Sequence, residues 1–380
     1  MRNLSLLGLG FALVLALACG SPSVPAQGRA QPGNEFRVFT SKAEVDSEEA
    51  VCAWYGDARD GVLYFGEAAF WSGLRATGSP LGELDHSGPR RIGRFDLRSG
   101  RMLPALLLAP KVRSGTWDVL AHPNGRIYFT TFFDGAGSVD PVTGEIEQFV
   151  DAGTGLNEWG LGPDKTLFVS RYAGDAGASG SLVWFNADGT LRKEFPLKAQ
   201  NGSVLAPKTV AYDPETRLVW VTSDILPSAP GAAGHPTLIV DLAGREQERI
   251  SDLEIQFVRF GADGTGYLAL VEENELQLAI LPPGTPADRL GQARRITLDD
   301  AFPSSLDFAQ NIRVEGSGQV LVTTWGGQIF VVEPSAPYPV RSFAFPRLAD
   351  GGLYYSAASD EDRLCATYCA ESTVVCTELD

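Results

Sequence analysis

Positive charge is scarce in this chain of 380 residues. Its 31 Lys and Arg are outnumbered by 47 Asp and Glu, which gives a net charge of −16 at pH 7. No basic cluster interrupts that excess, and a chain of this kind repels a phosphate backbone. We therefore expect no nucleic acid among its partners.

Several motifs of common enzymes are also missing. The sequence contains no Gly-x4-Gly-Lys-Ser/Thr loop, no His-Glu-x-x-His, no Gly-x-Ser-x-Gly and no Cys-x-x-Cys. These absences argue against P-loop nucleotide hydrolysis, zincin-type proteolysis, nucleophile-elbow hydrolysis and thioredoxin-like redox chemistry. A serine triad is defined by geometry and not by a motif, and nothing in the sequence suggests one.

A sustained helical period is absent as well, and short apolar runs bounded by Gly, Pro, Asp and Asn replace it. Such runs are typical of β-strands. One unit recurs, consisting of an apolar strand, a tight polar turn and a second apolar strand. Clear copies occupy residues 117–131, 158–170, 209–222, 257–269 and 311–323, and weaker ones surround residues 60–61 and 360–362.

Seven such units at intervals of roughly 40 to 60 residues, each followed by further strands, predict an all-β fold, a β-propeller of four-stranded blades. The turn centres are Gly61, Gly125, Lys165, Thr216, Gly264, Gly318 and Asp362. The last unit offers only three strands, and the run 35–40 can supply the fourth. We therefore predict one propeller domain over residues 35–380, with six blades and a capping hairpin as the alternative.

The first residues resemble a bacterial lipoprotein signal. Arg2 precedes an apolar run, residues 4–18, which is too short to cross a membrane comfortably, and Cys19 follows it. The resemblance implies a signal peptide over residues 1–18, a lipidated Cys19 and a flexible tether to residue 34. The Gly and Ser that follow Cys19 resemble the residues at these positions in lipoproteins of the outer membrane. The resemblance implies that the protein is anchored there and faces the periplasm or the cell surface. Simple secretion is the alternative.

Four further cysteines remain, an even number that suggests disulfides in an exported chain. They are Cys52, Cys365, Cys369 and Cys376. Of the three possible pairings we favour Cys365–Cys376 with Cys52–Cys369, which would join the C-terminus to the start of the folded region. A zinc site is the alternative, and Cys-x3-Cys-x6-Cys without a nearby His is poor spacing for it.

The repeats resemble those of a known superfamily. The segments 118–130 and 137–146 look like repeats of virginiamycin B lyase-like and SMP-30/gluconolactonase-like (strictosidine synthase-like) propellers, and the similarity covers about residues 110–330. It is specific for the fold and poor for activity. Where members are enzymes, the resemblance implies a divalent metal and acid or base residues at the mouth of the central channel.

The starts of the inner strands supply the candidates for such a site. One residue per unit is Trp117, Asn157, Lys208, Gln256 and Gln310, and the next is Asp118, Glu158, Thr209, Phe257 and Asn311. Because side chains alternate along a strand, we expect only one of each pair to face the channel.

A metal site is one hypothesis for these positions. The stretch 157–164 is similar to a metal-bearing segment of the gluconolactonases, which implies Asn157 as a ligand. The next positions should then be Asn and Asp, whereas this chain has Lys208 and Gln256, and a lysine opposes a cation. Asp118, Glu158 and Asn311 form a better oxygen set for Ca²⁺ or Mg²⁺. The favoured alternative is that ring residues only bind channel water and cap strands.

Two long insertions, residues 67–90 and 224–237, should project from one face. They contain His86 and His235, candidates for a catalytic base, although exposed loop histidines are commoner. We predict a ligand surface on this face formed by Trp71, Tyr172, Trp325, Gln256 and Lys208, unless the aromatic residues pack inward.

Together these features predict a lipid-anchored, extracytoplasmic, monomeric propeller that binds an envelope protein or a small ligand on its insertion-bearing face. The alternative is a metal-assisted lactone hydrolase or lyase, in which Asp118, Glu158, Asn157 and Asn311 hold the cation. A purely structural envelope lipoprotein is a third possibility, which the sequence does not separate from the first.

Overall fold

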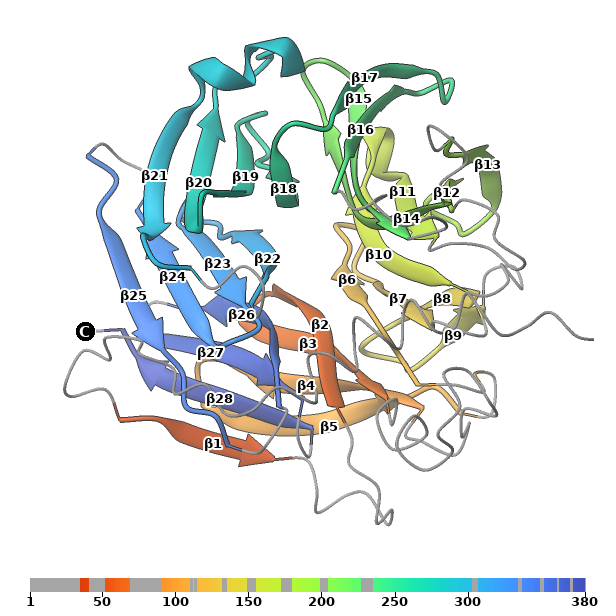
Figure 1. Ribbon diagram of the computed structural model, residues 1–380. Helices are drawn as coiled ribbons and strands as arrows, with labels where there is room; N and C mark the ends of the chain where they lie inside the picture. The colour runs from red at the N-terminus through yellow and green to blue at the C-terminus, as the bar shows by residue number, and fades with distance from the viewer. Residues whose placement is uncertain are drawn as a thin grey trace, which may run out of the picture.

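A ring of seven four-stranded antiparallel sheets surrounds a central channel in the computed structural model (Figure 1). The structure describes residues 35–40, 52–68, 90–109, 112, 115–131, 135–148, 155–171, 180–198, 204–226, 235–302, 307–333, 337–348, 352–360, 362–369 and 372–379. The predicted propeller with seven blades is therefore confirmed. Within these residues no helix is long and apolar enough to span a membrane.

Each blade runs outward from its innermost strand in chain order, except that the last blade ends on the first strand. Blade 1 contains β2 (Cys52–Arg59), β3 (Val62–Ala68), β4 (Arg91–Asp96) and β5 (Arg101–Leu107). Blade 2 contains β6 (Val119–Ala121), β7 (Ile127–Thr131), β8 (Gly135–Val139) and β9 (Ile146–Gln148). Blade 3 contains β10 (Leu156–Leu161), β11 (Leu167–Arg171), β12 (Ser181–Phe185) and β13 (Leu191–Pro196).

The remaining four blades repeat this plan. Blade 4 contains β14 (Val204–Asp213), β15 (Leu218–Leu226), β16 (Thr237–Asp241) and β17 (Glu246–Ile250). Blade 5 contains β18 (Glu254–Phe260), β19 (Gly266–Glu272), β20 (Glu275–Leu281) and β21 (Arg294–Asp299). Blade 6 contains β22 (Ala309–Val314), β23 (Val320–Thr324), β24 (Gln328–Val332) and β25 (Val340–Ala344). Blade 7 contains β26 (Tyr354–Ser359), β27 (Arg363–Tyr368), β28 (Thr373–Glu378) and β1 (Arg37–Thr40).

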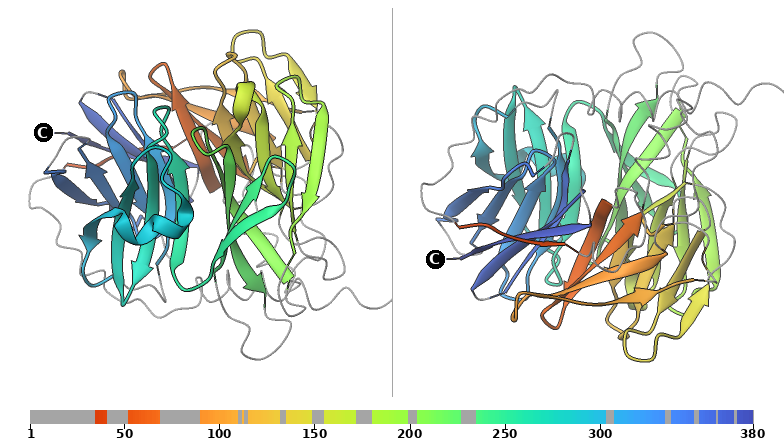
Figure 2. Two further views of the ribbon diagram at one scale, coloured as in Figure 1. Left: turned by 90° about the horizontal axis from the view of Figure 1, so that it is seen from above. Right: turned by 90° about the horizontal axis from the view of Figure 1, so that it is seen from below.

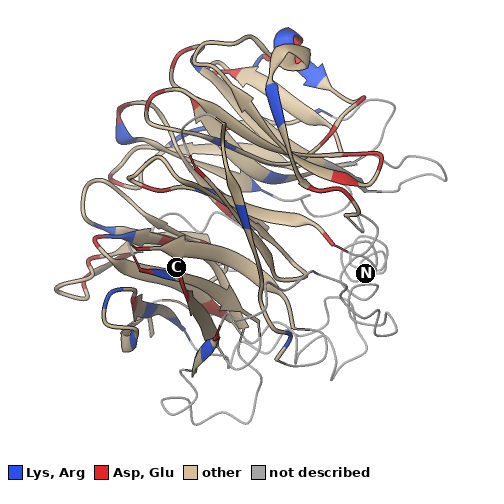
Figure 3. Ribbon diagram, turned by 90° about the vertical axis from the view of Figure 1, so that its left-hand side faces the viewer, with Lys and Arg blue, Asp and Glu red and all other residues tan. Residues whose placement is uncertain are grey.

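The hydrophobic core lies between neighbouring blades. Blades 5 and 6, for example, share a cluster in which Phe257 and Leu278 pack with Phe330. Because both faces of a sheet meet another sheet, the middle strands read as continuous apolar runs and not as strict alternations. Charged residues lie mainly toward strand ends and turns, as the red and blue segments of Figure 3 show.

The turns between first and second strands lie where the sequence predicted them. Gly264 has φ +81° and Gly318 has φ +86°, a left-handed backbone that only glycine adopts without strain. We call the end of the channel that carries these turns the hairpin face. The opposite end is the insertion face, because the two predicted insertions join strands there.

The first strand of the chain closes the ring, as predicted. β1 pairs antiparallel with β28, with Arg37 opposite Cys376 and Thr40 opposite Thr373, and the side views in Figure 2 show it at the outer edge of that blade. The chain therefore joins the propeller at the hairpin face. β1 therefore covers the outer edge of β28 and completes the fourth strand of blade 7 with the other end of the chain.

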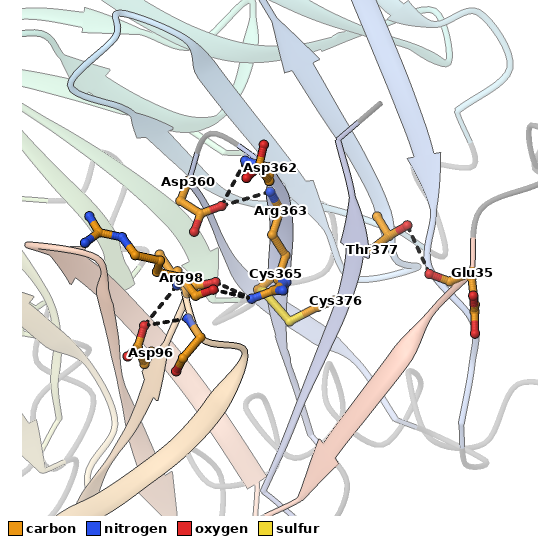
Figure 4. Close-up of a disulfide and its surroundings, with 11 residues drawn as sticks. Glu35, Asp96, Arg98, Asp360, Asp362, Arg363, Cys365, Cys376 and Thr377 are labelled. Carbon is orange, nitrogen blue, oxygen red and sulfur yellow. Dashed lines mark hydrogen bonds between the residues drawn. A yellow bond between two sulfur atoms is a disulfide. The ribbon is translucent and has the colours of Figure 1, made fainter.

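Both predicted disulfides are present. Cys365–Cys376 joins β27 to β28 within blade 7 (Figure 4), and Cys52–Cys369 joins blade 1 to blade 7. Beside the first, the Arg363 guanidinium reaches across to the carbonyl oxygens of Leu97 and Arg98 in blade 1. Covalent and polar contacts therefore both hold the seam between the last blade and the first.

We expect the Cys52–Cys369 bridge to contribute more stability than Cys365–Cys376. The first closes a separation of 317 residues and the second one of 11, so the loss of unfolded-state entropy amounts to about 6 and about 3 kcal/mol, respectively. Urea unfolding of the two double Cys→Ala variants measures this difference. Equal losses of unfolding free energy would contradict the expectation.

Candidate functional site

The inner strands break their pairing register where the sequence placed the channel residues. The register shifts between Ala53 and Gly56 in β2, between Leu156 and Trp159 in β10, and at equivalent points of β14, β18, β22 and β26. A bulge releases the residues inside it from strict alternation. In three of the predicted pairs only the second residue, Asp118, Glu158 or Asn311, lines the cavity in the channel.

Aromatic residues pack together at the insertion-face end of the inner strands. The centroids of the Trp54 and Trp117 rings lie 4.3 Å apart, and Tyr355 contacts Trp54 at 4.7 Å and Tyr55 at 5.1 Å. We call these four buried residues the aromatic cluster. Its members in blades 1 and 7 were missed because the sequence analysis identified channel positions only in the five middle blades.

Amide side chains of the ring connect neighbouring blades. The Trp117 indole N–H donates to Asn157 Oδ1 at 2.6 Å, and Asn157 Nδ2 donates to the carbonyl of Lys208 at 3.3 Å. Gln256 Oε1 accepts the backbone N–H of Ala309 at 2.7 Å. The Asn157 oxygen, expected to bind a metal, thus already accepts a hydrogen bond inside the protein.

The predicted ligand surface is described only in part. Trp71, Tyr172 and His86 lie outside the described residues. Trp325 is partly buried and packs against the aromatic cluster, which is the inward alternative. Gln256 is buried, and the half-buried Lys208 places its ammonium 5.4 Å from the Phe308 ring. The described members therefore stabilise the ring and do not form one exposed surface.

A cavity of about 500 Å³ occupies the hairpin-face half of the channel. Five blades line it, and the lining includes Leu161 of blade 3 and the hairpin turns of blades 5 and 6. Its polar wall is formed mainly by Asp57, Asp118, Glu158, Arg259, Asn311 and Arg313. This cavity lies at the opposite end from the insertion face on which we expected the ligand.

Asp118 and Glu158 form a pair of buried carboxyl groups in the wall of the cavity. Burial raises the pKa of Asp118 to about 7, although the backbone N–H groups of Trp159 and Val119 donate to its two oxygens at 2.7 and 2.8 Å. Burial and the Asp118 charge raise the pKa of Glu158 well above its usual range. Arg259 opposes both shifts.

The Glu158 side chain differs from that of Asp118, because no donor among the described residues reaches its carboxyl. Its backbone N–H donates to Ser170 Oγ at 3.1 Å, which fixes its place on β10. The residue is only 6% exposed, and its side chain lines the cavity. A molecule that enters the cavity can therefore donate to this carboxyl.

Arg313 and two carboxylates form a closed network on another wall. Arg313 pairs with Asp57, and its Nε lies 2.9 Å from Glu315 Oε1. Asp57 Oδ2 also accepts the N–H of Ala121 at 3.0 Å, and Glu315 accepts that of Ser359 at the same distance. Burial would lower the Arg313 pKa, but the two carboxylates raise it. The network joins blades 1, 2, 6 and 7.

The two described histidines take no part in the cavity. His122 is buried, and its Nε2 lies 2.9 Å from the carbonyl of Lys165 while its Nδ1 accepts the N–H of Asn124. Burial lowers its pKa, so this neutral ring supports a turn of the hairpin face. His235 is exposed at the start of blade 4's third strand, on the insertion face.

The structure brings together only some of the residues that the metal hypothesis named. Asp118, Glu158 and Asn311 line one cavity, whereas Asn157 does not. Among the residues that the structure describes, no three His, Cys, Asp or Glu side chains form a metal-binding group. Asp118 already accepts two N–H groups, and Arg259 competes for both carboxyls. The donor set does not fit the oxygen-rich cage that Ca²⁺ or Mg²⁺ requires.

We expect the unfolding free energy to fall between pH 5 and pH 8. Raised carboxyl pKa values mean that the folded chain binds protons more tightly, so this stabilisation is complete below the unfolded pKa and is lost as pH rises through about 7 for Asp118. Glu158→Gln should flatten the fall and stabilise the chain at pH 8 by ~1 kcal/mol or more.

Denaturant unfolding at both pH values measures this effect. Asp307, whose pKa burial raises to about 6, contributes to the slope in both proteins. The exposed Glu145→Gln is the matched control and should leave the slope unchanged. An unaltered slope in Glu158→Gln would contradict the assignment.

No family model and no curated protein sequence matches this chain. Among solved structures it resembles virginiamycin B lyase from Staphylococcus aureus, with a TM-score of 0.57, 12% identity, and coverage of 92% of this chain and 100% of that one. A catalytically inactive form of that lyase with quinupristin gives a TM-score of 0.59 at 11% identity and the same coverage.

A second kind of protein is equally similar. The extracellular domain of a hybrid two-component system from Bacteroides thetaiotaomicron gives a TM-score of 0.57 at 12% identity, covering 92% of this chain and 42% of that one. At such identities the likeness shows the fold alone. The chain therefore shares the β-propeller fold of virginiamycin B lyase, as the repeats predicted.

Proposed function

We propose that this chain is a lipid-anchored, extracytoplasmic β-propeller that binds a small polar ligand in the cavity of its hairpin face. The Glu158 carboxyl, which lines the cavity without a donor among the described residues, carries the proposal. A ligand that donates to it would form a hydrogen bond to a charged group, worth about 1.5–3 kcal/mol.

The dimensions of the site support a small ligand. About 500 Å³ falls within the usual range of small-molecule pockets. The aromatic cluster packs at the far end of the inner strands, so access is from the hairpin face. A protein partner on the insertion face has less support, because Trp325, the one described aromatic residue of the predicted ligand surface, packs inward.

Metal-assisted lactone hydrolysis or lyase chemistry is the alternative. Its support is that Asp118, Glu158 and Asn311 share the cavity. The oxygen atoms of these residues do not form the cage that Ca²⁺ or Mg²⁺ requires. We therefore derive no catalytic step that uses a metal ion. A stoichiometric Ca²⁺ or Mg²⁺ that raises the melting temperature and is lost in Asp118→Asn would favour the enzyme.

The cavity proposal is tested by narrowing the mouth. Leu161 lines the cavity and is 40% exposed, so Leu161→Trp should obstruct it without removing a hydrogen bond. Leu191, 47% exposed on β13 and outside the cavity lining, gives the matched control Leu191→Trp. Thermal unfolding of the full chain against a library of polar metabolites is the measurement.

At least one compound should raise the melting temperature by several degrees in the wild type and in Leu191→Trp. At a hundredfold excess over Kd, binding adds about 2.7 kcal/mol to the unfolding free energy. Leu161→Trp should lose the shift. The proposal is wrong if no compound acts, or if the shift survives in Leu161→Trp.

The lipid anchor is tested at Cys19. Expressed with its signal in a double-membraned bacterium, the wild type should fractionate with membranes and incorporate labelled palmitate. Cys19→Ala should lose the label and become soluble or remain unprocessed. A wild-type chain that is released without label would instead indicate simple secretion.

A further inference from the structure

We propose that the ligand is a free α-amino acid, held by its ammonium group at Glu158 and Asn311 and by its carboxylate at Arg259. This inference rests on the proposed function and specifies the chemistry of the same cavity. It follows from which of the wall's polar groups are already engaged inside the protein and which are not.

One cation of the cavity wall is left without a carboxylate partner among the described residues. Arg259 and Lys208 both act on the carboxyl pair, Arg259 on Asp118 and Glu158 and Lys208 on Glu158 alone. Of these two cations only Arg259 lines the cavity. The other lining guanidinium, Arg313, is shared by Asp57 and Glu315 in the closed network. Arg259 therefore remains as the cation that a ligand can reach.

The free acceptors match an ammonium group. Both oxygens of Asp118 accept backbone N–H groups, whereas those of Glu158 accept none among the described residues. Asn311 donates from Nδ2 to Ser356 Oγ at 3.2 Å, and its Oδ1 has no donor in the same part of the chain. An ammonium carries three donors and no acceptor, which matches acceptors without donors in the cavity wall.

The free donor matches a carboxylate. Arg259 donates from Nε to the carbonyl of Ile312 at 3.2 Å, and no described residue accepts from its terminal nitrogens. A guanidinium fork binds a carboxylate through two parallel hydrogen bonds. Arg313 differs, because Asp57, Glu315 and the carbonyl of Ala58 engage it.

The rest of the wall suits the side chain of an amino acid. Val119, Leu120 and Phe260 line the cavity beside the charged groups. A molecule with both charges and an apolar or neutral side chain therefore meets complementary surface on every side. A simple anion would meet the carboxyl pair, and a simple amine would leave Arg259 without its acceptor.

Isothermal titration of the full chain with each of the twenty L-amino acids tests the inference. At least one should bind. Its decarboxylated amine and its N-acetyl derivative should each bind at least tenfold more weakly, because each lacks one of the two charges.

Charge-removing variants assign the two ends of the ligand. Arg259→Gln should weaken the amino acid at least tenfold and leave the amine unchanged. Glu158→Gln should weaken both and leave the N-acetyl derivative unchanged. Arg192→Gln and Glu145→Gln, exposed on the outer strand of blade 3 and in a turn of blade 2, are the controls, and unliganded melting temperatures verify that each variant folds.

The outcomes separate this inference from the proposed function. If other metabolites bind in a way that Leu161→Trp abolishes while no amino acid binds, the cavity is a ligand site and the zwitterion is wrong. The same holds if an amino acid binds there equally well without either charge. Binding that survives Leu161→Trp, or no binding by any compound, overturns both.

Discussion

Closure of the ring is the constraint on which the remaining structure depends. A cavity lined by five blades exists only while all seven are held in one circle. The pairing of β1 with β28, the Cys52–Cys369 bridge and the reach of Arg363 into blade 1 all act at a single seam. The Arg313 network spans the same seam beneath the channel, so the wall of the site and the closure of the fold share residues.

Local breaks in the inner strands convert this closed scaffold into a site. In a regular strand successive side chains would alternate between the two neighbouring blades. The bulge at Glu158 instead places a carboxyl in the channel while the next residue, Trp159, donates its backbone N–H to Asp118. The cost is a buried pair of acidic groups that hold protons near neutral pH.

The fold was predictable from the sequence because it depends on local patterns of apolar and turn residues and on the number of strands in each repeat. Apolar runs and turns such as Asp60-Gly61 mark the strands, and a deficit of one strand in the last unit identifies residues 35–40 as its complement. Even the disulfide pairing follows the preferred assignment.

The site was less predictable, because it depends on register. Asp118, Glu158 and Asn311 were identified and do meet in one cavity, but the engagement of Asn157 by Trp117 could not be foreseen from spacing. Arg259 and Arg313 lie two residues further along their strands and had no motif to mark them. The long insertions also favoured a ligand site on the insertion face, whereas the cavity lies at the hairpin face.

The Cys52–Cys369 bridge gives the chain a topology that the hydrogen bonds alone do not. The bond makes a covalent circle of the chain from β2 to the end of β27, and the second disulfide attaches β28 to it. Of the described strands only β1 and β28 lie outside this circle, and β1 is the one without a covalent bond to it apart from the chain itself. A cut before residue 35 would therefore leave the circular scaffold intact, and even the peeling away of β1 would expose an edge without opening the ring.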